Sequence, residues 1–452
     1  MRAFLWSVAC AVSSGLAQTV SPTLVGTNLW YQMDGAKAGA LRPALAEVGF
    51  GLIRIGGNGY NKTWPGDAKV ATWCDYVRGL GAEPLVQVSA LATPEQVAAT
   101  VRALNRREGR VPVRRWSIGN EPDLDKWPVK RVRDYVLRLA EAMKHEDPTI
   151  QIYAPDLAGP HFDYIDPLVG GDLDITGAKL GDVFLIDGIT WHRYAFWKDF
   201  TREEAVDRVE AAYHAPIRRL RARLAEADAK HGRAGENALK WGLGEFNLHV
   251  VVKPASNPAL YQAVDGAGVN SFLNGQFFAE VYGVCMAERA EFAASWSIHE
   301  SNGDRGTTDF GLFDGPWAEA RPRASLHHSA LVAKYFKGEY KTVAHALPEF
   351  AAFATRNGEF TAVMLLNKSQ RKSRSLTLAF DGRQPTGSGT VSLASEAGAS
   401  LEARGAVART ELPAQSTRVL VFDAKGGVVR QIDYTLDDAK AGRAPKEQVF
   451  AP

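Results

Sequence analysis

The sequence is poor in cysteine, almost balanced in charge and, beyond its N-terminus, free of long hydrophobic runs. Three cysteines in 452 residues exclude a fold that depends on a framework of disulfides. The 53 lysines and arginines nearly cancel the 51 aspartates and glutamates, so neither nucleic acid nor an anionic membrane is an expected partner. The absence of a second long apolar run predicts that no segment spans a membrane.

The remaining composition is that of a globular protein. Hydrophobic residues make up 46% of the chain and charged residues 23%, which argues against disorder. A chain of 452 residues is too long for one ordinary domain, although an α/β barrel could fill most of it. The 11 tryptophans and 13 tyrosines would suit stacking on sugars, but most of them are expected in the core.

The first twenty residues, MRAFLWSVACAVSSGLAQTV, resemble a secretory signal peptide. A basic start precedes an apolar run too short to cross a bilayer comfortably, and Gly15 and Ala17 supply small residues before a cleavage site. Removal of residues 1–17 would leave a secreted or periplasmic protein. For its two cysteines, Cys74 and Cys285, two alternatives stay open: one disulfide or two buried thiols.

From residue 23 to about 335, short β-prone runs alternate with helical stretches. Thr93 and Thr201 each open a helix with a capping box, and the second helix is expected to run to about Gly232. Eight such units predict an α/β fold, a (β/α)8 TIM barrel. The expected strands are Thr23–Leu29, Phe50–Gly57, Glu83–Ala90, Arg114–Glu121, Thr149–Asp156, Ile186–Tyr194, Lys240–Asn247 and Phe292–Glu300.

Beyond about Gly338 the pattern changes to short β-prone segments separated by glycine, asparagine, aspartate and serine. This spacing predicts an antiparallel β-sandwich domain. The expected domains are a signal peptide at 1–17, a barrel at 18–337, a β-sandwich at 338–424 and a polar C-terminal extension at 425–452. The expected sandwich strands are Glu349–Ala354, Thr361–Leu366, Ser375–Phe380, Thr390–Ala394 and Thr417–Phe422.

The stretch RWSIGNEPD begins like a buried strand and stops on an amide, a carboxylate and a proline. Pro122 cannot donate to a sheet, so the strand must end here, with Asn120 and Glu121 at its C-terminal end. Glu245, in WGLGEFN, ends the seventh expected strand, which faces the fourth across a barrel mouth. Two carboxylates there could lie about 5 Å apart, as a retaining glycosidase needs. Taken singly, each glutamate would more simply be a solvated rim residue.

Other strand ends could support these carboxylates. Arg54 could pair with one of them and keep it ionised, or form a structural ion pair beneath the site. His192 and Tyr194 face the same side of the sixth expected strand, where the tyrosine could orient a nucleophile. The alternative is a hydrogen-bonded histidine and a packed tyrosine. Trp296 on the eighth strand could form a floor under a sugar ring, or belong to the core.

These motifs resemble those of glycoside hydrolase clan A, the retaining (β/α)8 glycosidases. Trp116–Pro122 is similar to the acid/base motif on strand four, and Gly244–Asn247 is similar to the nucleophile strand. Arg54 resembles the site arginine of strand two, and His192–Tyr194 resembles the His-any-Tyr ending of strand six. The resemblance covers about residues 23 to 335, and a C-terminal sandwich recurs in several families of the clan.

The resemblance implies a double displacement with Glu121 as acid/base and Glu245 as nucleophile. Asn120 would hydrogen-bond the sugar 2-hydroxyl. It also implies that no cofactor is needed, and no set of metal ligands stands out in the sequence. The other substrate-binding residues would be Arg54, His192, Tyr194 and Trp296.

Two types within the clan are similar to this sequence. RIGGN at 54–58 and the NEPD ending resemble the heparanase and β-glucuronidase type, and also endoglucanase and xyloglucanase families. GEFN departs from the Gly-Glu-Thr form of the heparanase type. Trp127, Trp197 and Trp317 lie on expected loops, where they either extend a cleft for a polymer or pack beneath the loops.

The sequence therefore predicts a secreted retaining glycosidase that cleaves β-glycosidic bonds of an oligo- or polysaccharide. The alternative is a catalytically inactive carbohydrate-binding protein on a glycosidase scaffold, which the retention of both glutamates argues against. The sandwich is expected either to support the barrel or to bind glycans, and nothing in the sequence points to an oligomeric state.

Overall fold

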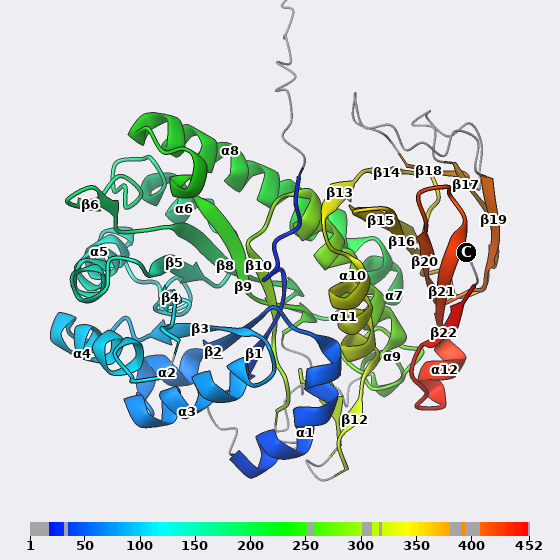
Figure 1. Ribbon diagram of the computed structural model, residues 1–452, viewed down its shortest axis with the longest axis horizontal. Helices are drawn as coiled ribbons and strands as arrows, with labels where there is room; N and C mark the ends of the chain where they lie inside the picture. Colours follow the sequence, from blue (N-terminus) through cyan, green and yellow to red (C-terminus); the bar gives the residue numbers. More distant parts are fainter. Residues whose placement is uncertain are drawn as a thin grey trace, which may run out of the picture.

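The structure, a computed structural model, describes residues 18–30, 35–109, 111–250, 257–300, 310–315, 319–379, 390–393 and 407–450. The predicted signal peptide and Trp317 lie outside these residues. Within them, no helix is both long enough and apolar enough to cross a membrane. A barrel and a pair of β-sheets lie side by side, with α10 (Phe272–Ala287) and α11 (Ala324–Tyr335) between them (Figure 1).

Eight parallel strands close the barrel in the order β1-β10-β9-β8-β5-β4-β3-β2, which confirms the predicted (β/α)8 fold. Every residue of β1 and β2 is buried, because strands of such a barrel are covered on both faces. Their C-terminal ends share one rim, where side chains from distant parts of the sequence meet. The strands are β1 (Val25–Trp30), β2 (Leu52–Gly56), β3 (Glu83–Val88), β4 (Arg115–Ile118), β5 (Gln151–Leu157), β8 (Gly188–Phe196), β9 (Lys240–His249) and β10 (Phe292–Ser295).

Helices surround the barrel, and two of them start at the capping boxes that the sequence predicts. α4 (Pro94–Asn105) begins after Thr93, whose side chain accepts a hydrogen bond from the Gln96 amide in the predicted capping box. Two short hairpins pair β6 (Lys179–Leu180) with β7 (Val183–Phe184), and β11 (Phe313–Asp314) with β12 (Arg321–Pro322). The other helices of this part are α1 (Gly35–Val48), α2 (Asn58–Lys62), α3 (Asp67–Arg78), α5 (Val129–Glu146), α6 (Phe162–Leu168) and α9 (Pro258–Tyr261), with a 3-10 turn at Gly235–Asn237.

The long helix predicted to start at Thr201 is interrupted. Thr201 caps α7 (Arg202–Val206) with the predicted box, but a π-helical turn at Glu210–His214 separates it from α8 (Ala215–His231). α7 already ends before Asp207, and Pro216, which has no amide hydrogen to donate to the carbonyl four residues earlier, lies in the first turn of α8 directly after the π-helical turn. The prediction was right about the helix start and wrong about its continuity.

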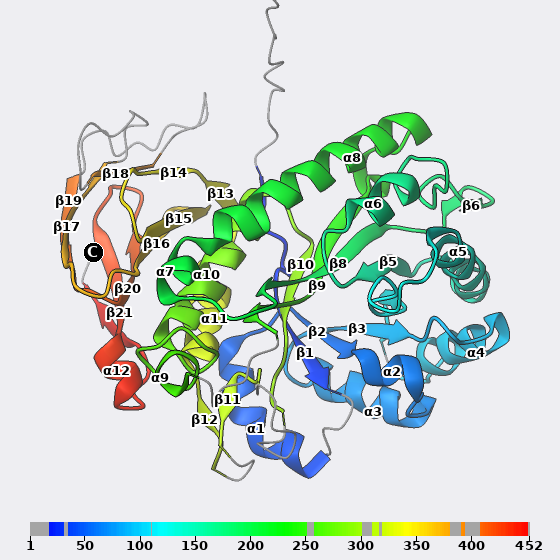
Figure 2. The same ribbon diagram turned by 180° about the vertical axis from the view of Figure 1, so that it is seen from behind.

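The second unit is a sandwich of two β-sheets, as Figure 2 shows from behind. One sheet has the order β13-β15-β16-β20-β21-β22 and the other β14-β18-β17-β19; all described pairs are antiparallel except β17–β18. Facing side chains such as Phe350, Leu365 and Leu376 form its core. The strands are β13 (Glu339–Lys341), β14 (Val343–Ala344), β15 (Phe350–Asn357), β16 (Phe360–Asn367), β17 (Arg374–Ala379), β18 (Thr390–Leu393), β19 (Val407–Leu412), β20 (Ser416–Phe422), β21 (Val428–Thr435) and β22 (Lys446–Val449).

The expected polar extension at 425–452 is not separate from the sandwich. It contributes β21 and β22 to the six-stranded sheet, with α12 (Leu436–Lys440) between them. Ile432 and Tyr434 are buried, whereas Asp433 between them accepts two hydrogen bonds from Arg418 at 2.6 and 3.0 Å. The high charge of the segment hid this alternation of buried and paired side chains, which has the period of a strand.

The two cysteines of the described chain are thiols. Cys74 lies in α3 and Cys285 in α10, and both are buried and unpaired. Burial raises the pKa of Cys74 to about 12, so this thiol stays protonated and unreactive at neutral pH. Of the two alternatives for these cysteines, the structure therefore has the buried thiols.

Polar side chains of α10 and α11 attach the sandwich to the barrel. Gln276 Nε2 donates to the carbonyls of Asn367 and Ser416 at 3.1 and 3.0 Å. His328 Nε2 lies 2.8 Å from Thr417 Oγ1. All five residues are buried, so the loss of either partner would leave a polar group without water or a replacement bond.

Replacement of Gln276 should therefore weaken this attachment. We expect Gln276→Ala to lower the free energy of unfolding by about 1–3 kcal/mol, because two buried carbonyls lose their donor. Urea denaturation followed by circular dichroism measures this change. Gln262→Ala, at an exposed position after α9, is the control and should change the free energy by less than about 0.5 kcal/mol. Equal stability of the two variants would contradict the role of Gln276.

Candidate active site

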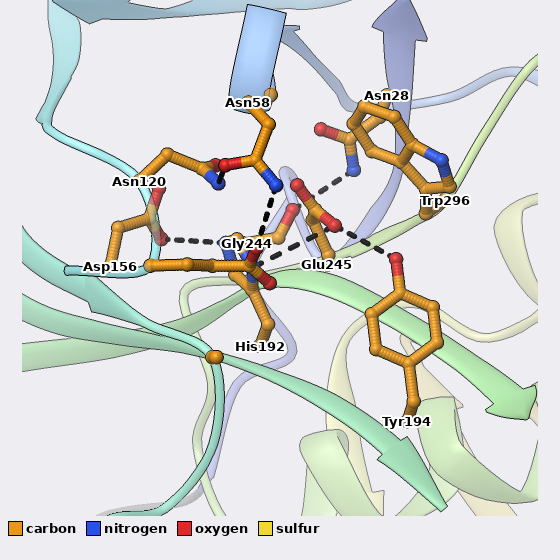
Figure 3. Close-up of polar contacts among 12 residues, drawn as sticks. Asn28, Asn58, Asn120, Asp156, His192, Tyr194, Gly244, Glu245 and Trp296 are labelled. Carbon is orange, nitrogen blue, oxygen red and sulfur yellow. Dashed lines mark hydrogen bonds and ion pairs between the residues drawn. The ribbon is translucent and has the colours of Figure 1, made fainter. Parts of the chain in front are cut away.

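The candidate site lies at the C-terminal rim of the barrel strands (Figure 3). Residues far apart in the sequence become neighbours there, because parallel strands end on the same side. The structure places at this rim Arg54 in β2, Asn120 and Glu121 after β4, His192 and Tyr194 in β8, Glu245 in β9, and Trp296 after β10. These are the seven residues that the sequence predicted for the site.

Arg54 is the residue around which the site is assembled. Its side chain is fully buried, and its two terminal nitrogens donate to side chains from five other parts of the barrel. Burial lowers the pKa of the guanidinium, but Asp156 and Glu245 outweigh burial and raise it, so Arg54 is charged. The acceptors are Asn28 Oδ1 (2.9 Å), Gln87 Oε1 (2.9 Å), Asn120 Oδ1 (2.6 Å), Asp156 Oδ2 (2.8 Å) and Glu245 Oε1 (3.0 Å).

Glu121 is held from three sides. Its amide donates to the Asp156 carbonyl at 2.8 Å, and Asn58 Nδ2 donates to its Oε2 at 3.0 Å. His192 Nδ1 lies 2.9 Å from Oε1. The backbone φ of Glu121 is 52° and that of Asp156 is 58°, a left-handed conformation that is uncommon outside glycine. Surrounding contacts must impose such a conformation, and here they direct the Glu121 carboxyl into the barrel mouth.

Glu245 is held by a different set of partners. Its Oε1 accepts the Arg54 hydrogen bond, and its Oε2 accepts one from the Tyr194 hydroxyl at 2.8 Å. Burial raises the pKa of Glu245, while the positive charges of His192 and Arg54 act against this rise. Both oxygens are thus oriented by donors, which favour the ionised carboxylate.

His192 is fully buried among three carboxyl groups. Its Nδ1 is 2.9 Å from Glu121 Oε1 and 3.6 Å from Glu245 Oε2. Its Nε2 is 3.3 Å from Asp156 Oδ1. Burial alone would lower the pKa of His192, but Glu245 and Asp156 outweigh it and raise the pKa to about 10. His192 is therefore an imidazolium at neutral pH.

Asp156 balances the two buried cations. Burial would raise the pKa of Asp156, but Arg54 and His192 hold it well below its usual range. Gly244, which precedes Glu245, leaves room for this arrangement, because a Cβ there would lie 2.4 Å from Asp156 Oδ1. Asp156, Arg54 and His192 are thus held in place by close packing as well as by their ion pairs.

The carboxyl groups of Glu121 and Glu245 approach each other across the mouth. One oxygen of each and a ring nitrogen of His192 all lie within 4.8 Å of one another. A separation near 5 Å is that of retaining glycosidases, whereas inverting enzymes need about 6.5–9.5 Å. By distance alone the three groups could hold a metal ion.

An aromatic wall lies beside the carboxyl groups. Trp30, Tyr194 and Trp296 form one buried cluster, and Trp296 Nε1 donates to Glu300 Oε1 at 2.8 Å. Gly57 allows the close approach of Trp296, because a Cβ at Gly57 would lie 2.5 Å from the indole ring. Its φ of 106° also suits glycine. Trp296 thereby has a fixed position at the edge of the site.

Four residues that the sequence did not single out complete the site: Asn28, Asn58, Gln87 and Asp156. Asn28 and Asp156 stand near the ends of predicted strands, as Glu121 does, so a search for every polar strand end would have found them. Gln87 lies inside a strand and Asn58 follows a glycine pair. Their contacts with Arg54 and Glu121 depend on how the strands are placed next to one another.

No protein-family model and no curated protein sequence matches the chain. Solved structures of glycosidases do match its fold. A family 51 α-L-arabinofuranosidase from Bifidobacterium longum has 12% identity and a TM-score of 0.62, over 90% of this chain and 95% of that one. A family 44 xyloglucanase from Paenibacillus polymyxa has 14% identity and a TM-score of 0.59, over 90% and 97%.

A family 30 subfamily 8 xylanase from Clostridium acetobutylicum is similar as well, with 14% identity and a TM-score of 0.56 over 90% of this chain and 97% of that one. The chain has the fold of the clan A glycosidases. The matches cover 90% of the chain, so they extend over both the barrel and the C-terminal sheets. At this level of identity the architecture is what is shared, and the chemistry must be argued from the site.

The raised pKa of His192 predicts a pH-dependent stability. Folding favours the imidazolium, so its contribution is fully present below the ordinary pKa of 6.5 and is lost as the pH rises to about 10. Over that interval the free energy of unfolding should fall by up to about 1.4 kcal/mol per pH unit. Urea denaturation of the parent and of His192→Gln across this range measures the difference.

The variant His145→Gln is the matched control, since His145 is exposed near the end of α5. It should follow the parent, whereas His192→Gln should lose most of the slope. Parallel curves for the parent and His192→Gln would show that His192 does not carry this charge.

Proposed function

We propose that the protein is a retaining glycoside hydrolase that cleaves β-glycosidic bonds of an oligo- or polysaccharide. The observation that carries this proposal is the approach of the Glu121 and Glu245 carboxyl oxygens to within 4.8 Å at the barrel mouth, each with its own hydrogen-bond partners. The shared fold with arabinofuranosidase, xyloglucanase and xylanase structures supports glycoside hydrolysis, while the β configuration of the bond is proposed from the sequence motifs.

In the first step, Glu121 donates its proton to the glycosidic oxygen while the bond from that oxygen to the anomeric carbon breaks. Glu245 attacks the same carbon from the opposite face and forms a covalent glycosyl-enzyme. The hydrogen bonds from Arg54 and Tyr194 to Glu245 direct the attacking oxygen. Asn120, fixed by Arg54 and Asn58, would contact the sugar 2-hydroxyl.

In the second step, Glu121 is a carboxylate and takes a proton from a water molecule. That water attacks the anomeric carbon, breaks its bond to Glu245 and restores both residues, so the configuration is retained. Asn58 Nδ2 and His192 Nδ1 contact the two carboxyl oxygens of Glu121 and hold the group in place in both steps.

The alternative, an inactive carbohydrate-binding protein, does not need two carboxyl groups at this separation. Burial of Glu121 and Glu245 among donors has a desolvation cost, which catalysis explains and binding alone does not.

We further propose that residues 1–17 direct export, that 18–337 is the catalytic barrel and that the sheets after it support the barrel.

Substitution of the two glutamates should give different kinetic results. Glu245→Ala should lose activity on all nitrophenyl glycosides by about 10³-fold or more, because no nucleophile remains. Glu121→Ala should keep far more activity on dinitrophenyl than on alkyl glycosides, because a good leaving group needs no proton. Release of nitrophenol and of reducing sugar measures both.

The substrate panel should include α-L-arabinofuranosides, β-xylosides and β-glucosides, with a set of plant, microbial and animal polysaccharides. Azide should rescue Glu121→Ala with retained configuration in the glycosyl azide, and Glu245→Ala with inverted configuration. Full activity of Glu245→Ala would contradict the nucleophile assignment. A parent that cleaves no glycan but binds one would favour the binding protein.

A further inference from the structure

Trp197 differs from the other tryptophans of the described chain in its exposure. It is 44% exposed, while Trp30, Trp191 and Trp296 are buried and Trp127 is half-buried. An indole at a surface forgoes the stabilisation that burial of so much apolar area would provide. Single exposed apolar side chains also occur elsewhere on the protein, so the position of Trp197 must carry the argument.

Trp197 directly follows β8, the strand that carries His192 and Tyr194. Its ring packs against Tyr194 with centroids 6.1 Å apart at 73°, and the Tyr194 hydroxyl donates to Glu245 Oε2 at 2.8 Å. One aromatic ring thus separates Trp197 from the proposed nucleophile. In this edge-to-face pair, Tyr194 covers at most one face of the indole. The other face is open to contact with a ligand.

The neighbours of Trp197 hold it in place. Phe196 and Phe200 are buried and stack on each other at 4.2 Å and 11°. Phe200 in turn packs on Tyr261 at 5.4 Å. The turn that carries Trp197 is therefore anchored on both sides, and the exposed ring is presented by a fixed backbone.

We propose that Trp197 is a binding platform for a second sugar unit, next to the one whose bond is cleaved. The inference rests on the proposed function and narrows it to substrates of two or more linked sugars. The apolar face of a sugar ring can cover the free indole face, while its hydroxyls stay in water. Aryl monosaccharides cannot supply that second sugar.

Trp127 is a loop tryptophan that packs against its neighbours, which is the alternative role that the sequence left open for Trp197. Its ring meets Tyr135 edge-on at 5.6 Å, and the Arg131 guanidinium lies 3.6 Å from its centroid. Both contacts are internal to α5 and the loop before it, and they bury part of the ring. Of the loop tryptophans that the sequence singled out and the structure describes, only Trp197 is exposed and also contacts a residue, Tyr194, that is bonded to Glu245.

The test compares Trp197→Ala, Trp197→Phe and Phe360→Ala with the parent. Phe360, 50% exposed on the sandwich, is the matched control. For each protein, kcat/KM is measured on xyloglucan, xylan and arabinan and on the nitrophenyl monosaccharides. Retardation in native gels that contain each polysaccharide measures binding independently of catalysis.

Trp197→Ala should lose at least tenfold in kcat/KM on the polysaccharide that the parent degrades, and less than threefold on the nitrophenyl glycoside. Trp197→Phe should lose less, and Phe360→Ala nothing. Equal losses on both substrates would overturn the inference, because Trp197 would then act only by supporting Tyr194. No loss on either would overturn it as well.

The gel measurements distinguish a failure of the Trp197 proposal from a failure of the proposed hydrolase function. A parent that cleaves nothing but is retarded, with the retardation lost in Trp197→Ala, would contradict the hydrolase and support the platform. A parent that is active on aryl glycosides but equally retarded with and without Trp197 would contradict the platform alone. A parent that neither cleaves nor is retarded would contradict both.

Discussion

The buried guanidinium of Arg54 is the constraint on which the site depends. A charge without access to water must be neutralised and its donors satisfied, or the folded chain loses several kcal/mol. Asp156 and Glu245 neutralise this charge, and five acceptors from five parts of the barrel surround its two terminal nitrogens. Because Glu245 and Asp156 are among them, the contacts that stabilise the barrel mouth are also those that position its carboxyl groups.

The two glutamates differ in surroundings, and the difference suits two roles. Glu245 lies between Arg54 and Tyr194, whose hydrogen bonds favour a carboxylate ready to attack. Glu121 has a left-handed backbone conformation, and its carboxyl group contacts Asn58 and His192. A pair of carboxyl groups acquires separate functions only when their environments are unlike, and the strands supply that asymmetry.

Fold prediction succeeded where local pattern and tertiary structure agree. The barrel strands are apolar runs because both of their faces are covered, so the sequence alone reveals them. It failed at 425–452, where charged residues conceal a strand in which Ile432 and Tyr434 are buried, and at 207–214, where a break and a π-helical turn interrupt a run that otherwise has the period of a helix.

The sequence by itself determined the eight-fold alternation, the fourth and seventh barrel strands as those that place Glu121 and Glu245, and the helix caps at Thr93 and Thr201. Each of these depends on neighbours a few residues away. Only the tertiary structure decided that Asn58 and Gln87 join the site, and that Trp197 is open while Trp127 is packed. Those outcomes depend on barrel closure and strand register, which bring distant parts of the chain into contact. The separation of two residues along the sequence does not predict such a contact.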